Sequence, residues 1–550
     1  MKIAVFLGSR LGNRPLYRET AEKTGEWIAR SGHSLIYGGE AMGLMGVLAD
    51  RALEGGASVT GVVPDIPLLK EQRHPGLTEY IPVKDMAERK KAMLDRADLF
   101  LCLPGGMGTL DEFTDVMVSV QLGLFQKPCV LFDAGGYYRA FGAFLEQMAE
   151  EGFLDRGLLE AVTITEDFSE IDALIAGREE KAAKEAEEKA LIREIGRSFG
   201  LSGEPEKITP ITAGLINRTL RVSFGGREYI FQTINSNVFR DPRSLMENIG
   251  LVTRHLEKKR REGSYPAGTL HFYPAGDGSL CLEKDGCFWR VCDYIPSVTP
   301  DKLPGEEAVR RVGEAFGQFQ AALSDLDGRL LRETIPAFHD TAARLRHLFA
   351  SADVDSLGRR AEAAEELAAF AAVRDKAAAL SEAFAGGAFP VRVTHNDTKT
   401  NNILLDPESG ATKAVIDLDT VMPGFAPYDF ADAVRYLANT AAEDEPDLSK
   451  VALDLGRFTA LAEGFVPQVR GAWTKEELEA LPLAAFSLTV ETAARFLDDY
   501  LTGDTYFRTE YPGHNLVRAR SQLALARSMM RQGEAMEEVI RRLAADEKEG

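Results

Sequence analysis

The stretch from His395 to Asp419 reads HNDTKTNNILLDPESGATKAVIDLD and predicts a β-hairpin. Two apolar runs flank a turn from Pro407 to Gly410, and polar residues adjoin both runs. Pairing the runs would bring three oxygen-bearing side chains to one end of the hairpin: Asp397, Asn402 and Asp417. Phosphoryl transfer needs such a set, because a carboxylate orients the attacking hydroxyl and hard oxygen ligands hold the magnesium that bridges the phosphates.

A surface hairpin is the competing interpretation of this stretch. Aspartate and asparagine often make turns by bonding their own backbone, and that explains Asp406 and Glu408. It does not explain why polar residues gather at the ends of two strands that otherwise read as buried. The pattern therefore favours a catalytic site.

Length and composition limit the rest of the chain. With 550 residues, it is too long for one core and should hold at least two domains. Its formal net charge of −21 argues against nucleic acid or an anionic membrane as the main partner. Local basic pockets for phosphates remain compatible with that charge.

The start of the chain and the cysteines indicate a cellular location. Met1 leads directly into the strand-like run Ile3–Leu7, so we expect no signal peptide, and no apolar run is long enough to span a bilayer. The five cysteines are scattered, and the three from Cys281 to Cys292 lack zinc-type spacing. We expect a cytoplasmic protein with reduced thiols.

The first 177 residues alternate between strand-like and helix-like segments. Such alternation predicts an α/β doubly wound parallel sheet of the Rossmann-like type, with helices on both faces. Ligands of such folds bind at the carboxyl ends of the strands. Polar and glycine-rich turns at that edge are therefore candidate ligand sites.

Three glycine-bearing turns follow predicted strands and precede predicted helices. Glycine lets the backbone approach a ligand closely, and free N–H groups at a helix start suit a phosphate. A single such turn is weak evidence, because these folds need glycines for tight turns in any case. The candidate nucleotide- and phosphate-binding residues are Gly8, Ser9, Gly38, Gly39, Gly105, Gly106, Gly108 and Thr109.

Glu112 lies one turn into the helix that begins at the last of these turns. A carboxylate beside a phosphate site can stabilise an oxocarbenium-like centre or activate water, which is the chemistry of glycosidic cleavage. Arg89, within the charged run from Glu88 to Lys91, is a candidate partner. Alternatively, Glu112 complements the helix dipole and the charged run is a solvated face. Composition alone leaves both interpretations open.

The motifs around these residues closely resemble the Lonely Guy family of nucleoside 5′-monophosphate phosphoribohydrolases. They are MAERKKAMLDRADLFLCLPGGMGTLDEF, with YGGEAMGLMG before it and QLGLFQKPCVLFDAGGYY after it. The resemblance implies that Arg89 and Glu112 are the catalytic pair, that the PGGMGT loop holds the 5′-phosphate, and that the protein forms a homodimer through this domain. Glu40 and Arg10 depart from the small residues common in the family, so the identity of the substrate base stays open.

The segment from Arg178 to Arg197 reads REEKAAKEAEEKALIREIGR. Alanine, glutamate and lysine in this proportion predict a solvated helix with i,i+4 charge pairs, which acts as a semi-rigid spacer. A coiled coil is the weaker interpretation, because apolar heptad positions are not sustained. We therefore expect domains at residues 1–177 and 198–550, joined by a charged helical linker at residues 178–197.

The remainder begins with strand-like segments and continues with helices, which predicts a small α+β lobe joined to a mostly helical lobe. The turn from Thr212 to Asn217 lies between the first two strands and could cover a phosphate. It offers Gly214 and Asn217 as nucleotide-binding candidates, although one glycine is a weak signal.

HNDTKTNN followed by VIDLDT resembles the aminoglycoside phosphotransferase and choline kinase superfamily, which has a two-lobed protein-kinase-like fold. The segments ITAGLINRTLRV, YIFQTINSNVF and DPRSLMENI look closest to N-acetylhexosamine 1-kinase. The resemblance implies ATP and Mg²⁺ as cofactors, a sugar acceptor and Asp397 as the catalytic base. It implies that Asn402 and Asp417 hold magnesium, that His395 braces the loop, and that Asp419 either supports these ligands from behind or contacts the substrate.

One departure from that family concerns the nucleotide. Gln232 stands where a strand usually provides a lysine for the α- and β-phosphates. A neutral amide donates a weaker hydrogen bond than a charged group. We expect magnesium and an arginine such as Arg243 to compensate, and Glu247 to lack its usual lysine partner. Gln232 and Glu247 remain nucleotide-binding candidates.

Together these patterns predict a bifunctional enzyme. One domain would hydrolyse a nucleoside 5′-monophosphate to a free base and ribose 5-phosphate, and the other would phosphorylate a small-molecule hydroxyl, such as that of a sugar. We expect small-molecule substrates and neither nucleic acid nor membrane as partners. The alternative is a hydrolase whose kinase-like domain is a non-catalytic sugar or nucleotide sensor, and Gln232 is the residue in its favour.

Overall fold

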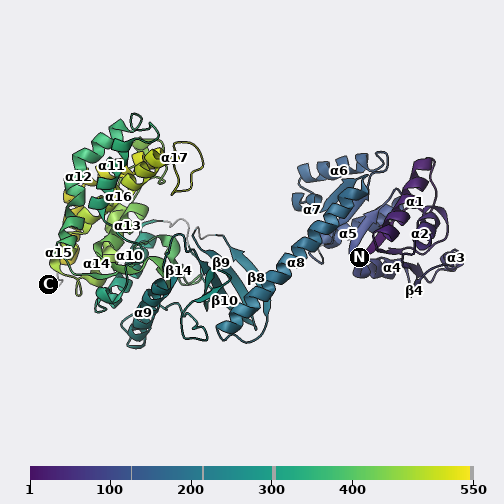
Figure 1. Cartoon of the computed structure of the whole chain (residues 1–550), viewed down its shortest axis with the longest axis horizontal. Helices are drawn as coiled ribbons and strands as arrows, with labels where there is room; N and C mark the ends of the chain where they lie inside the picture. Colours follow the sequence, from purple (N-terminus) through teal and green to yellow (C-terminus); the bar gives the residue numbers. More distant parts are fainter. Residues whose placement is uncertain (126, 213–215, 300–304, 546–550) are drawn as a thin grey trace. The chain divides into compact units, whose positions relative to one another are not determined.

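The computed structural model describes residues 1–125, 127–212, 216–299 and 305–545 (Figure 1). They form two compact units, Met1–Glu187 and Glu188–Gly550. The division falls inside the predicted charged linker. None of the described helices combines the length and apolar character needed to cross a membrane.

The first unit is built on a seven-stranded sheet in which all neighbouring strands run parallel, in the order β4-β3-β2-β1-β5-β6-β7. The strand order reverses at β1, where β2 lies on one side and β5 on the other. The strands are β1 (Lys2–Phe6), β2 (Ser34–Tyr37), β3 (Val59–Pro64), β4 (Glu79–Val83), β5 (Leu99–Cys102), β6 (Cys129–Phe132) and β7 (Val162–Thr165).

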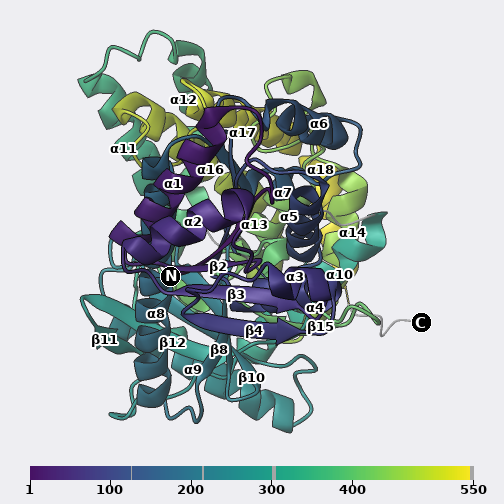
Figure 2. The same cartoon turned by 90° about the vertical axis from the view of Figure 1, so that its right-hand side faces the viewer.

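Alternating side chains of β1 enter two separate cores, one on each face of the sheet. Ile3 and Val5 pack with residues of α1, α2 and α8, whereas Ala4 and Phe6 pack with residues of α4 to α7. Helices on both faces confirm the predicted doubly wound fold (Figure 2). The helices are α1 (Pro15–Arg30), α2 (Gly43–Glu54), α3 (Pro67–Glu71), α4 (Met86–Arg96), α5 (Met107–Gln121), α6 (Arg139–Glu150), α7 (Arg156–Glu160) and α8 (Phe168–Ser198).

Helix α8 contains the predicted linker and is longer than expected. Its first turns belong to the first unit, where Ile171 is buried and the indole N–H of Trp27 donates to Asp172 (2.9 Å). Residues 176–187 are exposed. Ile192 and Ile195 are buried in the core of the second unit. The second unit therefore begins within this helix, and the division at residues 177 and 197 stays a proposal.

The second unit opens with a five-stranded sheet in the order β11-β12-β10-β9-β8, and all its pairings are antiparallel. Its strands are β8 (Pro205–Ile211), β9 (Arg218–Phe224), β10 (Arg227–Ile234), β11 (Leu282–Lys284) and β12 (Cys287–Asp293), and α9 (Pro242–Arg261) lies between β10 and β11 in the chain. A helical lobe follows, so the predicted kinase-like combination of a strand-rich lobe and a helical lobe is confirmed.

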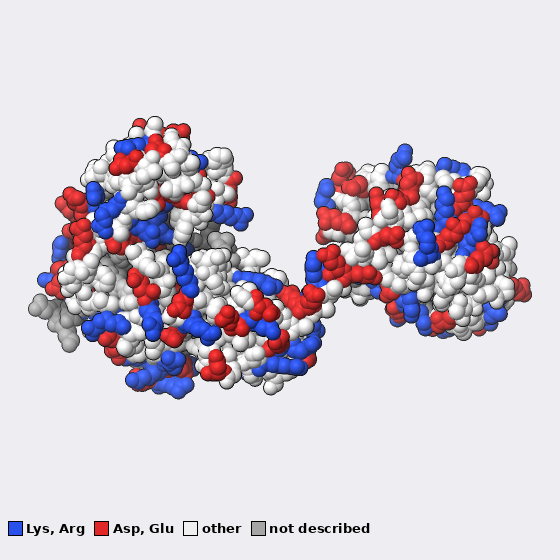
Figure 3. Space-filling model, viewed as in Figure 1, with Lys and Arg blue, Asp and Glu red and all other residues white. Residues whose placement is uncertain are grey.

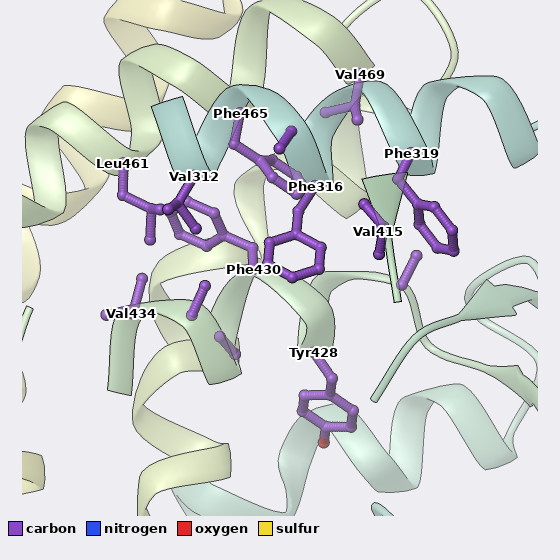
Figure 4. Packing of buried hydrophobic residues seen from close by; sticks show 14 of the residues in the cluster. Val312, Phe316, Phe319, Val415, Tyr428, Phe430, Val434, Leu461, Phe465 and Val469 are labelled. Carbon is purple, nitrogen blue, oxygen red and sulfur yellow. The ribbon is translucent and has the colours of Figure 1, made fainter. Parts of the chain in front are cut away.

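The helical lobe contains most of one large core and a second, separate cluster of buried apolar residues. Phe316 of α10 lies beside Phe430 of α13 and Phe465 of α14, and Phe319 lies near Val415 (Figure 4). Its helices are α10 (Gly305–Leu323), α11 (Thr341–Val354), α12 (Ala364–Ala385), α13 (Pro427–Leu437), α14 (Leu455–Val469), α15 (Lys475–Glu479), α16 (Leu481–Thr502), α17 (His514–Arg531) and α18 (Gly533–Ala544), with short 3₁₀ turns η1 (Gly328–Leu330), η2 (Thr400–Asn402), η3 (Leu418–Thr420) and η4 (Leu448–Lys450).

The stretch from His395 to Asp419 forms the predicted hairpin. Strands β14 (Ile403–Leu405) and β15 (Thr412–Val415) pair antiparallel and form the hairpin. The short strands β13 (Arg392–Thr394), before it, and β16 (Met422–Gly424), after it, also pair antiparallel with each other. The carboxyl end of β13 and the end of β15 therefore carry the candidate catalytic residues.

Candidate active sites

In the first unit, the three predicted glycine turns lie side by side, because they follow the adjacent strands β2, β1 and β5. The backbone N–H of Gly8 donates to the carbonyl of Pro104 (3.2 Å). A Cβ atom at Gly43 would lie 2.1 Å from the carbonyl oxygen of Ser9, so only glycine allows that approach. The structure thus gathers Gly8, Ser9, Gly38, Gly39 and the loop after β5 at one edge of the sheet.

The loop after β5 presents the start of α5. Gly106 caps this helix without a side-chain hydrogen bond, and Gly106 and Gly108 have open space where a Cβ would stand. Thr109 is buried, and its hydroxyl fills the space beside Gly105, where a Cβ would lie 2.1 Å away. A 15-residue helix with exposed glycines and uncapped amide groups at its start suits a phosphate.

Arg89 of α4 and Glu112 of α5 meet beside this helix start. Both are buried, and the Arg89 Nη2 atom lies 3.5 Å from Glu112 Oε1. A Cβ at Gly38 would lie 1.9 Å from the same Nη2 atom, so the guanidinium occupies the space that the glycine leaves. Arg89 Nε has no hydrogen-bond partner among the described residues. This pair therefore has unused hydrogen-bonding capacity for a ligand.

The environment of Glu112 shifts its titration toward neutrality. Burial raises the pKa of its carboxyl to about 7, and the nearby Arg89 charge only partly opposes this. A carboxyl that titrates near neutral pH can exchange a proton with water or substrate under physiological conditions. Glu112 also lies beyond the first turn of α5 and contacts Arg89, so its position favours a role in the site over one that only complements the helix dipole.

The two residues that depart from the family pattern lie in different settings. Glu40 is buried, forms an isolated β-bridge with Arg73, and accepts a hydrogen bond on its carbonyl from the Tyr37 hydroxyl (3.2 Å). Arg10 is exposed beside Ser9. Glu40 is thus held inside the fold next to Gly39, whereas Arg10 is exposed to solvent next to Ser9.

In the second unit, Asp397 lies in the loop between β13 and η2. The Asn402 side-chain amide donates to its carbonyl (2.8 Å) and to its Oδ2 atom (3.1 Å), and Lys399 Nζ lies 2.8 Å from its Oδ1 atom. Asp397 is half-buried, and 24% of its side chain is exposed to solvent. The structure brings the expected base and one expected metal ligand together. The Lys399 contact was not predicted.

A buried carboxylate on α13 holds this loop in place. Asp429 accepts the backbone N–H groups of His395 and Asn396, each at 2.8 Å, and the side-chain amide of Gln320. The His395 ring bonds the carbonyl of Ile416 (3.0 Å), which ties the loop to the end of β15. The contact supports the bracing role expected of His395 and adds Asp429 to it.

Asp417 lies two residues after the end of β15. Its backbone φ is 59°, in the left-handed region. Its side chain is reachable by solvent, yet the surrounding protein and the charges of Asp419 and Asp397 raise its pKa to about 6. Carboxylates that repel each other in this way favour a bound divalent cation. The donor set of Asp417 and Asn402 fits Mg²⁺, which usually takes few protein ligands beside phosphates and water.

The candidate nucleotide residues of the strand lobe are only partly brought together. Asn217 reaches the C-terminal lobe, where its amide donates to Asp419 Oδ2 (2.5 Å). Gln232 lies on β10 with its amide bonded to neighbouring strands. Glu247 faces solvent and pairs with Arg332 at 3.3 Å. Gly214 lies outside the described residues.

The expectation that Arg243 compensates for the missing lysine is not supported. Arg243 is exposed and lies 3.6 Å from Glu283 on the outer part of the lobe. Arg290 of β12, which the sequence did not single out, lies beside Gln232 instead and pairs with Asp419. The sequence offered no signal for this, because Arg290 sits inside a run that reads as a buried strand.

The first unit matches the family model described as possible lysine decarboxylase over residues 45–175. The chain is 42% identical over 166 residues to a cytokinin riboside 5′-monophosphate phosphoribohydrolase of Rhodococcoides fascians, covering 30% of this chain and 84% of the relative. It is 39% identical over 153 residues to a probable enzyme of the same name from Oryza sativa subsp. japonica, covering 28% of this chain and 72% of the relative. The first unit belongs to the cytokinin riboside 5′-monophosphate phosphoribohydrolase family.

The second unit matches the model of the phosphotransferase enzyme family over residues 207–463. It is similar to spectinomycin phosphotransferase in complex with ADP and spectinomycin, with 11% identity and a TM-score of 0.42 over 62% of this chain and 98% of that one. A microcompartment-associated aminopropanol kinase shows 15% identity and the same score over 63% of this chain and 98% of that one. The two family-model matches confirm the resemblance of the first unit to the phosphoribohydrolases and of the second to the phosphotransferase enzyme family, and the N-acetylhexosamine 1-kinase branch stays a prediction.

Proposed function

We propose that the phosphoribohydrolase unit hydrolyses the N-glycosidic bond of a nucleoside 5′-monophosphate. Water adds to the anomeric carbon, the bond to the base breaks, the base takes up a proton, and ribose 5-phosphate is the second product. The amide groups at the start of α5 hold the 5′-phosphate. Glu112 stabilises the oxocarbenium-like centre or activates the water, and Arg89 orients Glu112.

The observation that carries this proposal is the buried Arg89–Glu112 pair beside the uncapped start of α5. The names of the relatives support the reaction, whereas Glu40 and Arg10 leave the base undefined. Glu112→Ala tests the assignment: we expect loss of base release from a nucleoside monophosphate with an unchanged circular dichroism spectrum. Unchanged base release would refute the role of Glu112.

We further propose that the phosphotransferase unit transfers the γ-phosphoryl group of ATP to a hydroxyl of a small molecule, with a sugar as the preferred acceptor. Asp397 accepts the hydroxyl proton while the new O–P bond forms and ADP leaves. Asn402 and Asp417 would hold Mg²⁺, which supplies charge neutralisation at the phosphates. Asp397, Asn402 and Lys399 in mutual contact carry this proposal.

A non-catalytic sugar or nucleotide sensor remains the second candidate, because Gln232 supplies no charge. ADP release measured against a panel of free sugars separates the two, with Asp397→Ala as the control. Sugar-dependent ADP release that Asp397→Ala abolishes supports the kinase. Absence of such release in the unaltered protein would contradict it.

A homodimer formed through the phosphoribohydrolase unit is our proposal for the assembly. Apolar side chains are exposed at the end of α5 and directly after it, at Val118, Leu122 and Leu124. Clustered exposed apolar side chains often mark a protein interface. Phe144 and Phe153 add further exposed apolar area in the same unit.

The proposed setting is the cytoplasm, with small molecules as substrates. All five cysteines are unpaired, as expected in a reducing compartment. Figure 3 shows acidic and basic side chains interspersed over the visible face, a distribution that offers nucleic acid little concentrated positive charge there.

A further inference from the structure

Arg290 and Gln232 lie directly opposite each other on the neighbouring strands β12 and β10. Arg290 Nε donates to Gln232 Oε1 (3.0 Å), and Gln232 Nε2 donates to the hydroxyl of Thr219 on β9 (2.9 Å). Both polar ends of the Gln232 amide are therefore engaged within the sheet. This amide orients the guanidinium, and it is not directed at a ligand.

The guanidinium of Arg290 reaches the helical lobe at the proposed metal site. Nη1 and Nη2 donate to the two carboxylate oxygens of Asp419, at 2.5 and 3.0 Å. Asp419 lies in η3, two residues after Asp417, the residue proposed to hold magnesium. The cation thus lies beside the place where a metal-bound phosphate would be held.

We propose that Arg290 supplies, from strand β12, the positive charge for the nucleotide phosphates that the lysine position on β10 lacks. Gln232 acts as a positioning residue that aims the guanidinium, and Asp419 holds it between the lobes. This inference rests on the proposed phosphotransferase function and adds a residue to it.

The surroundings favour this role over a purely structural ion pair. Arg290 is 3% exposed, and burying a cation costs free energy. If the Arg290–Asp419 pair only filled space between the lobes, two apolar residues would stabilise the fold as well or better. Lys399 already pairs with Asp397, and Arg243 lies on the outer surface, so neither is placed to act from the strand lobe. Gln232, Asp419 and the sulfur of Met246 engage four of the five guanidinium N–H donors, which leaves one N–H on Nη2 for a phosphate oxygen.

Affinities of the intact chain for ADP and for adenosine, both with magnesium, test the proposal by calorimetry. Arg290→Met should weaken ADP binding at least tenfold and leave adenosine binding unchanged, because adenosine has no phosphates. Gln232→Lys/Arg290→Met returns the charge to β10 and should recover most of the ADP affinity. Arg243→Met is the matched control and should bind both ligands as the unaltered protein does.

Gln232→Lys alone covers the case in which Arg290→Met fails to fold, because it leaves the Arg290–Asp419 pair intact. If Arg290 already fills the cationic position, the added lysine meets a like charge and ADP binds no more tightly. A tenfold gain in ADP affinity for Gln232→Lys, or full ADP affinity in Arg290→Met, would overturn the inference. Failure of the unaltered chain to bind ADP would instead contradict the proposed phosphotransferase function.

Discussion

Gly38 shows how one missing side chain shapes the phosphoribohydrolase site. Its backbone is not in the left-handed region, so alanine meets no conformational penalty there, but its Cβ would lie 1.9 Å from Arg89 Nη2. We predict that Gly38→Ala displaces the guanidinium and lowers base release on the order of 100-fold, since small misplacements of catalytic groups have effects of that size.

Gly177→Ala is the matched control for that substitution. Gly177 lies in helix α8 with open space where a Cβ would stand, so the change should leave base release unchanged. Steady-state kinetics of both variants make the comparison. Equal activity of Gly38→Ala and Gly177→Ala would contradict a role for the placement of Arg89.

Glu112 predicts a specific pH dependence. Its pKa of about 7 lies above the ordinary value for glutamate, so the carboxylate form is lost as the pH falls through 7. Because the proposed chemistry needs the carboxylate, kcat/KM for base release should fall about tenfold per pH unit below 7. A profile that is flat from pH 6 to 8, or that rises toward acid, would contradict this.

The substrate phosphate, whose second pKa is about 6, titrates close to the same range. The pH dependence of inhibition by ribose 5-phosphate reports phosphate ionisation separately, because this product binds without any bond being broken. Subtracting this pH dependence from that of kcat/KM for base release leaves the contribution of Glu112.

The sequence predicted which residues lie together better than the contacts they make. Arg89 with Glu112, and Asp397 with Asn402, were singled out because local motifs contain them, and each pair is in contact in the structure. Arg290 was missed because its partners come from β10 and η3, and pairing register is not readable from one strand. Arg243 was chosen for its charge, but it lies on the helix face that points outward.

At the scale of elements, the loop from His395 to Asn402 depends on helix α13. Asp429→Asn keeps the size of the side chain but turns an amide toward backbone N–H groups, so one buried donor loses its acceptor. Such a loss costs about 1–3 kcal/mol. We predict a lower melting temperature and a strongly reduced rate of ADP release, measured by thermal denaturation and a coupled assay.

Asp406→Asn provides the comparison for that change. Asp406 also accepts backbone N–H groups, from Glu408 and Ser409, but in the hairpin turn away from Asp397. ADP release should stay close to that of the unaltered protein. If Asp429→Asn were equally active, α13 would not hold the catalytic loop in its working geometry.

Helix α5 serves the site at its start and presents apolar residues at its end. Leu122→Glu places a charge in the proposed interface, and we predict that it converts a homodimer into a monomer. Leu330→Glu alters an equally exposed leucine of the other unit and should leave the dimer intact. Light scattering after size exclusion gives both masses, and a dimer that persists in Leu122→Glu would exclude this face.

Element types were predictable where hydrophobic periodicity was strong, as in the alternating strands and helices of the first unit. The limits of α8 were not, because its apolar residues at both ends belong to two different cores and the charged middle conceals them. Ile192 and Ile195 read as isolated apolar residues in a polar helix, and only the sheet of the second unit explains their burial.

At the scale of the whole molecule, the chain joins two complete folds, each with its own core and its own candidate site. Each site draws its described residues from one unit only. The two proposed reactions therefore need no shared residue, although both concern sugars and phosphates. A single chain that carries them should show two activities that can be removed one at a time.

The most direct test is a mass-spectrometric assay of the intact protein that follows free base and sugar phosphate together. Nucleoside monophosphates, and ATP with magnesium and a panel of sugars, are supplied to the unaltered chain, Glu112→Ala and Asp397→Ala. We predict that the unaltered chain forms both products, that Glu112→Ala loses only the base, and that Asp397→Ala loses only the sugar phosphate. An unaltered chain that forms no sugar phosphate, or one substitution that removes both products, would contradict two independent active sites.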